Sequence, residues 1–253
     1  MKPKTYLVGQ PVDCHTSTVG RATKAYVGLD MEDRRLVFIK DQWRPIARGA
    51  HPEIETYERL RKHKVSCVAT CLGGGDTISK DGTVQRTLTH ELFPQDATFD
   101  NSERFHTRLV LKEIGIPLEE YPNSTELITI VYHALVGGSP RITLTYKTCT
   151  HDYFLGHRGA WERAEVLHRD LSPGNIMINV ESEPLTGFLT DWDMCKYRID
   201  LVTNVPALPG RSVSPTSCNA ERHSAHIHGR ELGPTCRRYV CNTPRSLKRL
   251  PTI

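Results

Sequence analysis

Two motifs that lie close together in the chain constrain its fold more than any other feature: HRDLSPGN at residues 168–175 and GFLTDWD at residues 187–193. In the first, the carboxylate of Asp170 has the chemistry to orient an attacking hydroxyl group. The amide oxygen of Asn175 and the carboxylate of Asp191 are hard oxygen donors, which suit Mg²⁺ held against nucleotide phosphates. An HRD triplet alone is common in surface turns, whereas the full string followed by an apolar strand ending in Asp is specific. The motifs therefore predict a phosphoryl-transfer site and a fold that brings both loops together.

The composition is that of an ordinary globular protein, with 38% hydrophobic and 25% charged residues among 253. This length allows one large domain or two small ones. A formal net charge of +4 without a basic stripe argues against nucleic-acid binding. The polar start of the sequence and the lack of a long apolar run argue against a secretory signal and a membrane span, so we expect an intracellular protein, in the cytoplasm or the nucleus. The eight cysteines form no CxxC pair and are expected to be free thiols.

The first half of the chain predicts strands and one helix. Two segments rich in strand-forming residues, 26–30 and 35–40, flank a short polar turn and predict a β-hairpin. Pro52 can begin a helix, because apolar residues follow it at helical spacing. Further strands are expected at 83–92 and 106–111.

The second half of the chain predicts helices separated by breaks. Residues 112–117 interrupt the strand pattern and indicate a hinge. Asn123 and Glu126 form a capping-box pattern at the start of one predicted helix, and a second helical piece is expected at 160–166. Between the two helices, residues 137–147 carry turn formers and then β-branched residues, so we expect them to interrupt the helix.

From residue 198 onward the composition shifts to Pro, Ser, Thr, Arg, Cys and His, with Tyr239 as the sole aromatic residue, so we expect an irregular tail. Possible metal ligands gather within this tail, at His223, His226, His228, Cys218 and Cys236. Their spacing fits no standard zinc site, and we interpret them as solvated tail residues.

The sequences HRDLSPGNIMI and GFLTDWDMCKY resemble the fungal-type protein kinase family, a divergent branch of the protein-kinase-like fold. Earlier segments agree with this resemblance, at 35–44, 52–65, 73–76 and 108–119. The resemblance implies an α+β, bilobal fold. Its expected parts are an antiparallel-sheet N-lobe over 1–111, a hinge and truncated helical C-lobe over 112–197 with an insertion at about 137–156, and an irregular low-complexity tail over 198–253.

The resemblance also implies roles for charged residues in the first half of the chain. Lys40, at the end of VFIK, resembles the strand lysine that contacts the α and β phosphates of ATP. Glu55 resembles the helix glutamate that pairs with this lysine, with Glu53 and Glu58 as competing choices. The predicted catalytic set is Asp170, Asn175, Lys40 and Glu55.

The loop that covers the phosphates is expected between residues 18 and 27, where Gly20 and Val27 would contact ATP. Ala22 and Ala25 replace the other glycines of this loop, and a Cβ keeps backbone amides farther from phosphate. By resemblance, the adenine would hydrogen-bond backbone groups between Lys112 and Ile114.

The site also departs from the common kinase pattern. Ser172 stands two residues after Asp170, where many serine/threonine kinases carry a lysine, so the transition-state charge has one cation fewer. Asp193 is interpreted as a solvated loop carboxylate and Trp192 as a packed aromatic residue. After Asp191 the sequence shows neither an APE-like segment nor the amphipathic helices that support the catalytic loop in kinases.

The resemblance implies ATP-dependent phosphorylation of protein serine or threonine, with ATP and Mg²⁺ as cofactors. The missing helices leave open a non-catalytic pseudokinase or binding module, whose exposed apolar surface would attract a protein partner. A divergent natural chain, altered splicing or a shifted reading frame would each account for them. TDWD also resembles the metal loop of aminoglycoside and choline kinases, which are small-molecule phosphotransferases, but Arg169 stands where those families often have Gly.

Overall fold

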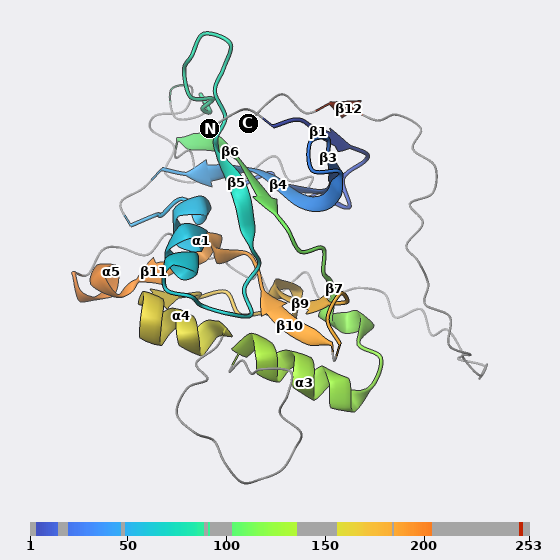
Figure 1. The fold of residues 1–253 in the computed structure, drawn as a ribbon. Coiled ribbons are helices and arrows are strands. Elements are labelled where there is room, and N and C mark those ends of the chain that lie inside the picture. Colours follow the sequence, from blue (N-terminus) through green and yellow to red (C-terminus); the bar gives the residue numbers. More distant parts are fainter. Residues whose placement is uncertain are drawn as a thin grey trace, which may run out of the picture.

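A computed structural model describes residues 4–14, 20–46, 49–88, 91, 103–135, 156–183, 185–203 and 248–249. Over these residues the fold is α+β, with a large antiparallel sheet and few helices (Figure 1). Apart from Gly156, the predicted insertion lies outside the described residues, as do the histidines and cysteines of the predicted tail. No helix among the described residues is both long and apolar enough to cross a membrane.

The large sheet is built around the predicted hairpin, which is confirmed: β3 (Lys24–Asp30) pairs antiparallel with β4 (Arg35–Pro45). The Oδ1 atom of Asp30 closes the turn, because it accepts hydrogen bonds from the backbone nitrogens of Glu32 (3.0 Å) and Asp33 (3.2 Å). The strand order is β12-β1-β3-β4-β6-β5, with β2 beside β3. The other strands are β1 (Tyr6–Val8), β2 (Asp13–Cys14), β5 (Cys71–Asp76), β6 (Arg104–Leu111) and β12 (Lys248–Arg249).

Strand β4 presents two different faces, because successive side chains along a strand point to opposite sides of the sheet. Val37 and Ile39 are fully buried on one face, in an apolar cluster with residues of β1 and β6. Phe38, Lys40 and Gln42 occupy the other face, which meets helix α1 (Glu53–Lys62) through hydrogen bonds from Lys40 and Gln42. The alternation of the strand therefore directs two polar side chains toward the interior of the fold.

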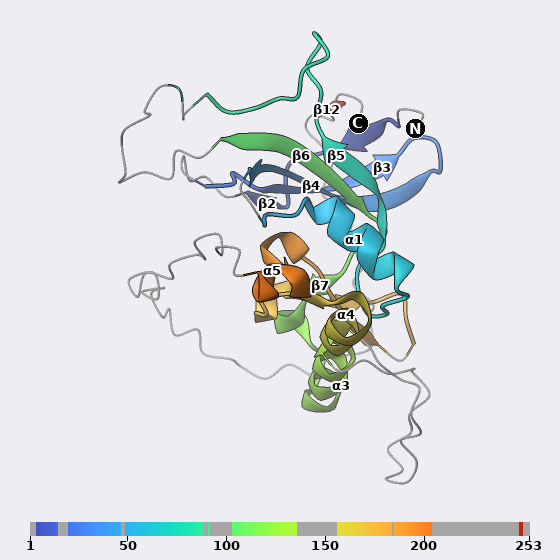
Figure 2. The same ribbon diagram turned by 90° about the vertical axis from the view of Figure 1, so that its left-hand side faces the viewer.

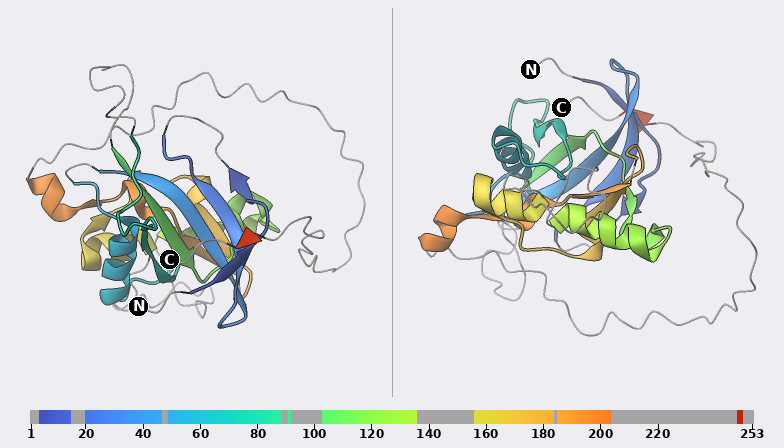
Figure 3. Two further views of the ribbon diagram at one scale, coloured as in Figure 1. Left: turned by 90° about the horizontal axis from the view of Figure 1, so that it is seen from above. Right: turned by 60° about the horizontal axis from the view of Figure 1, so that its bottom comes forward.

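Helix α1 lies between the large sheet and the remaining elements (Figures 1 and 2). Farther from the sheet, α3 (Ser124–Leu135) and α4 (Gly156–Ala164) lie side by side, as the right-hand view of Figure 3 shows. The predicted cap of α3 is present, since Asn123 Oδ1 accepts a hydrogen bond from the Glu126 nitrogen (3.0 Å). The remaining elements are α5 (Arg198–Val202), the sheet of β7 (Ile116–Pro117), β9 (Ile176–Asn179) and β10 (Thr186–Leu189), the pair β8 (Val166–Leu167) and β11 (Lys196–Tyr197), and the 3₁₀ helices η1 (Leu118–Glu120), η2 (Pro173–Asn175) and η3 (Trp192–Met194).

The strand predicted at 83–92 is wrong for the part of it that the structure describes. Val84 and Arg86 form only isolated bridges, to Ile78 and to Phe105. Because these two partners belong to different segments, no continuous ladder can form along the chain here.

The prediction that the chain becomes irregular at residue 198 is wrong at its start, where α5 is a helix. Asp200 caps this helix, because its Oδ2 atom accepts a hydrogen bond from the Tyr197 nitrogen (3.0 Å). At the other end of the predicted tail, β12 pairs with β1.

The larger apolar core lies between α1 and the pair α3 and α4, and it supports both motif loops. Ile130 of α3 and Leu189 of β10 are fully buried in it. Between them, Gly187 lies so close to α3 that an added Cβ would be 2.0 Å from the backbone oxygen of Ile130. Strand β10, which leads into Asp191, is therefore seated directly on the main chain of α3.

Replacing Gly187 with Ala should force β10 and α3 apart and lower the free energy of unfolding by about 1–3 kcal/mol. Chemical denaturation measures this loss. Gly9→Ala is the matched control, because a Cβ at Gly9 meets no atom within 4 Å. Equal losses in the two variants would contradict the close approach of β10 to α3.

Candidate active site

Lys40 and Glu53 form a buried ion pair between the large sheet and α1. Glu53 is the first residue of α1 and is 6% exposed. Its Oε2 atom lies 2.8 Å from Lys40 Nζ and accepts a second hydrogen bond from Gln42 Nε2 (3.2 Å). Its Oε1 atom accepts a hydrogen bond from the backbone nitrogen of Trp192 (3.1 Å). Both oxygens of Glu53 are thus used, and they join the strand lysine to the TDWD loop.

The assignment of Glu55 as the partner of Lys40 is wrong, because Glu55 is exposed on α1 while Glu53 makes the pair. Two residues along a helix turn the side chain by about 200°, so the two glutamates face opposite sides. A signal in the sequence identifies the correct one. Glu53 precedes the buried Thr56, Tyr57 and Leu60 by three, four and seven residues, which is the spacing of one helical face.

Lys40 also contacts the metal loop predicted from the TDWD sequence. Its Nζ atom lies 2.5 Å from Asp191 Oδ1 and 3.4 Å from Asp193 Oδ2. Burial alone would lower the pKa of Lys40, but the carboxylates of Asp191 and Glu53 raise it, so the ammonium stays charged. Burial acts against the charge of Asp191 as well, yet Lys40 holds the pKa of that carboxyl below its usual range.

The backbone at Asp191 lies in the left-handed region, with φ 62° and ψ 62°. This conformation is uncommon for a residue with a side chain and costs free energy, and such residues gather at functional sites. Here it turns the chain from β10 into η3, so that Asp191 and Asp193 lie near Lys40 while Trp192 between them is fully buried.

Asp193 is a functional candidate that the sequence interpretation missed. Its side chain is only 9% exposed, which overturns its reading as a solvated carboxylate. The Oδ2 atom pairs with Arg21 and faces Lys40, while Oδ1 is buried with no hydrogen-bond partner among the described residues. Arg21 also contacts the sulfur of Met194. The only clue in the sequence is that Asp193 follows Asp191 by two residues.

One carboxylate oxygen each from Glu53, Asp191 and Asp193 lies within 4.8 Å of the other two. Carboxylates are the ligands that Mg²⁺ prefers, and the buried Oδ1 atom of Asp193, which no described residue hydrogen-bonds, is an oxygen that a cation would satisfy. The donor set of this chain therefore fits Mg²⁺.

Asn175 lies beside the metal loop, since its backbone oxygen accepts a hydrogen bond from the Thr190 nitrogen (3.1 Å). Its side-chain Nδ2 atom donates to the backbone oxygen of Asp170 (2.7 Å), which orients the amide within its own loop. The amide oxygen is the acceptor atom of Asn175 that suits a cation. Asp170 itself is half-buried.

His168 connects the catalytic loop to the metal loop. It is fully buried, its Nε2 atom donates to the backbone oxygen of Thr190 (2.9 Å), and its Nδ1 atom accepts from the Asp170 nitrogen (3.3 Å). These bonds require a neutral ring with its proton on Nε2, and burial lowers the pKa of His168 in agreement. The ring also packs against Trp192, with centroids 4.4 Å apart.

Apart from Lys40, the residues predicted to contact the nucleotide lie on three segments. Gly20 (φ 106°) and Ala22 (φ 45°) are in the segment before β3, and Val27 is in β3 itself. Lys112 and Ile114 lie between β6 and β7, where the Lys112 nitrogen donates to the Thr70 oxygen (2.9 Å). The predicted hinge residues thus lie on the segment that joins the large sheet to the sheet of β7, β9 and β10. Among the described contacts, none joins Lys112 or Ile114 directly to Lys40.

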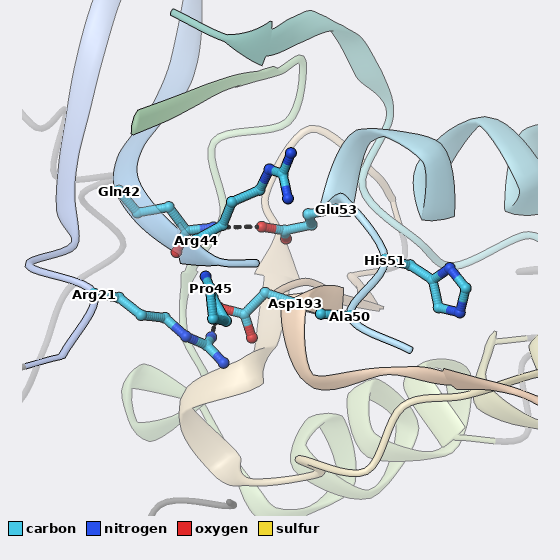
Figure 4. A pocket seen from close by; sticks show the side chains of 8 residues that line it. All are labelled: Arg21, Gln42, Arg44, Pro45, Ala50, His51, Glu53 and Asp193. Atoms are coloured by element: carbon cyan, nitrogen blue, oxygen red, sulfur yellow. Dashed lines mark hydrogen bonds and ion pairs between the residues drawn. The ribbon is translucent and has the colours of Figure 1, made fainter. Parts of the chain in front are cut away.

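A pocket opens beside Glu53, the ion-pair partner of Lys40 (Figure 4). Two of its basic residues are held by carboxylates outside it, because Arg44 pairs with Asp76 (2.6 Å) and His51 with Asp200 (2.7 Å). Arg21 instead points at Asp193 within the pocket (Figure 4). The lining residues are Arg21, Gln42, Arg44, Pro45, Ala50, His51, Glu53 and Asp193.

The sequence profile of the fungal protein kinase family matches residues 1–139, which is just over half of the chain. The chain belongs to this family, and the resemblance found from the motifs is confirmed. No curated protein matches the sequence. The profile match includes Lys40, Glu53 and every strand of the large sheet except β12. It ends before Asp170, so the assignment of that residue rests on the HRDLSPGN motif.

Glu53→Gln should lower the free energy of unfolding by about 1–3 kcal/mol, because Lys40 and the Trp192 N–H lose a charged acceptor in a buried place. Glu55→Gln is the control and should change it by less than about 0.5 kcal/mol, since Glu55 is exposed. Urea denaturation of both variants measures the difference. A larger loss of stability in Glu55→Gln than in Glu53→Gln would instead support Glu55 as the partner of Lys40.

Proposed function

We propose that this chain is an ATP-dependent protein serine/threonine kinase. The observation that carries the proposal is the position of Lys40, which lies between Glu53 on α1 and Asp191 on the metal loop. A strand lysine paired to a helix glutamate, with a metal-binding aspartate beside it, is the arrangement that protein kinases require for phosphoryl transfer.

In this proposal Lys40 contacts the α and β phosphates of ATP. Asp191, Asp193 and the amide oxygen of Asn175 would hold Mg²⁺, and the ion would supply the charge neutralisation that the phosphates need. Asp170 accepts a hydrogen bond from the substrate hydroxyl and aligns its oxygen with the γ phosphorus.

The oxygen–phosphorus bond then forms as the bond to the leaving oxygen of ADP breaks, and Asp170 takes the hydroxyl proton. The chain's contribution is mainly positioning. The hydrogen bonds of His168 to Thr190 and to Asp170 set the catalytic loop against the metal loop, which fixes the attacking group relative to the bound phosphates.

The rest of the nucleotide would lie between the large sheet and the sheet of β7, β9 and β10. Gly20 and Val27 would cover it from the sheet, and backbone groups between Lys112 and Ile114 would hydrogen-bond the adenine. In this arrangement the large sheet with α1 forms the N-lobe and α3, α4 and the small sheets form a truncated C-lobe, so the protein is bilobal. We place the protein inside the cell, acting on a protein substrate, without a nucleic-acid or membrane ligand.

One observation favours a second candidate, a non-catalytic pseudokinase. Both cations of the site already face carboxylates, Lys40 at Asp191 and Arg21 at Asp193, so acidic groups of the chain itself compensate the charges that would bind phosphate. A chain of this kind would bind nucleotide without turnover and act through a protein partner.

Transfer of labelled phosphate from ATP to a mixed protein substrate tests the primary proposal. Asp170→Ala should reduce incorporation by about 10²–10⁴-fold, because the substrate hydroxyl loses its base, while binding of ATP with Mg²⁺ is retained. Equal incorporation by both proteins would contradict the role of Asp170.

Thermal-shift titration with ATP and Mg²⁺ separates the two candidates. Stabilisation of the wild type that Asp191→Ala abolishes, without phosphate transfer to protein, would establish the pseudokinase. Transfer to an aminoglycoside or choline in place of protein would identify a small-molecule phosphotransferase.

A further inference from the structure

Three carboxylates and two cations meet between the phosphate-covering segment, β4, α1 and the metal loop. The carboxylates are Glu53, Asp191 and Asp193, and the cations are Lys40 and Arg21. Within this group, three negative charges face two positive ones. Lys40 faces all three carboxylates, and Arg21 pairs with Asp193.

Arg21 reaches this group from a firmly placed backbone. Its carbonyl oxygen accepts a hydrogen bond from the Trp43 nitrogen (2.8 Å), which ties the segment to β4. Its flanking residues Gly20 and Ala22 both have positive φ values, so the chain turns sharply on either side of Arg21. The side chain is 23% exposed and extends to Asp193 (Figure 4). Because the backbone at Arg21 is held by β4, rotation of the side chain alone can move the guanidinium from one binding partner to another.

The contact that Arg21 makes would compete with a metal ion. Asp193 offers a buried Oδ1 atom with no hydrogen-bond partner in the described part of the chain, and its Oδ2 atom is the one that Arg21 pairs with. A divalent cation held by Asp191 and Asp193 would repel a guanidinium at the same carboxylate, because like charges a few Å apart are costly in a partly buried site.

We propose that Arg21 is a phosphate-binding residue, which exchanges its contact with Asp193 for the β and γ phosphates of ATP when a divalent cation binds Asp191 and Asp193. This inference rests on the proposed kinase function. The planar guanidinium suits phosphate, because it offers paired donors to two oxygens. It would also supply positive charge where Ala22 and Ala25 replace loop glycines and where Ser172 stands in place of a lysine.

Arg21→Ala tests the exchange through binding rather than turnover. Titration of Mn²⁺ followed by electron paramagnetic resonance, without nucleotide, should show about tenfold tighter binding in the variant, because the competing guanidinium is gone. Calorimetry with Mg²⁺ present should show about tenfold weaker binding of ATP and a change of less than about twofold for AMP, which lacks the β and γ phosphates.

Arg44→Ala is the matched control, since it removes the same charge from the same pocket but leaves Asp193 untouched. It should change Mn²⁺ and ATP binding by less than about twofold. Arg21→Lys keeps the charge without the planar fork, so Mn²⁺ binding should stay near that of the wild type while ATP binding weakens. Thermal unfolding of each variant checks that it is folded.

Three results would overturn the exchange. They are unchanged Mn²⁺ binding in Arg21→Ala, an equal loss of ATP and AMP binding in that variant, and equal effects of Arg21→Ala and Arg44→Ala. A site that takes no nucleotide looks different, because the wild type itself would then bind neither ATP with Mg²⁺ nor Mn²⁺. A chain that binds ATP without turnover also remains distinguishable, because these measurements record binding and the phosphate-transfer assay records the function.

Discussion

The rest of this structure depends on the buried ammonium group of Lys40. It lies 2.8 Å from Glu53 and 2.5 Å from Asp191, which come from a helix and a loop separated by more than half of the chain. A buried charge is tolerated only when it is paired, so the sheet, α1 and the metal loop must be in place together. The Trp192 nitrogen adds to this constraint by donating to the same glutamate. The ion pairs of Lys40 therefore have two effects: they form the centre of the candidate site, and they join the large sheet to α1 and the metal loop.

A second set of contacts transmits this arrangement to the catalytic loop. The ring of His168 packs on Trp192, and its two nitrogens bond Thr190 on one side and Asp170 on the other. The position of Asp170 is thus tied through His168 to the residues that flank Asp191. Asn175 completes the connection, because it bonds the backbone of both Asp170 and Thr190. The two motifs form one hydrogen-bonded unit although eleven residues separate them in the sequence.

Much of this could be predicted from the sequence, because local patterns determine it. The hairpin of β3 and β4, strand β6 and the cap of α3 follow from alternation, composition and a short capping signal. The family follows from two motifs with specific spacing, and the profile match agrees.

What could not be predicted depends on contacts between distant segments. The position of Glu53 requires the rotational phase of α1, which the choice of Glu55 misjudged by about half a turn. The strand expected at 83–92 needed a continuous partner, and its described residues find only isolated bridges to two different segments. The role of Arg21 depends on a carboxylate more than half the chain away, for which a single sequence carries no signal.

The contact of Gly187 with the Ile130 carbonyl has a consequence for how the chain can vary. The distance between β10 and α3 is set by main-chain atoms, which are the same whatever side chains α3 carries. The outward positions of α3, such as Ile128 and Tyr132, are therefore open to substitution without displacing the aspartates that follow β10. The closest steric limit at this interface therefore lies at one glycine, and the exposed positions of α3 can vary while the site above it keeps its geometry.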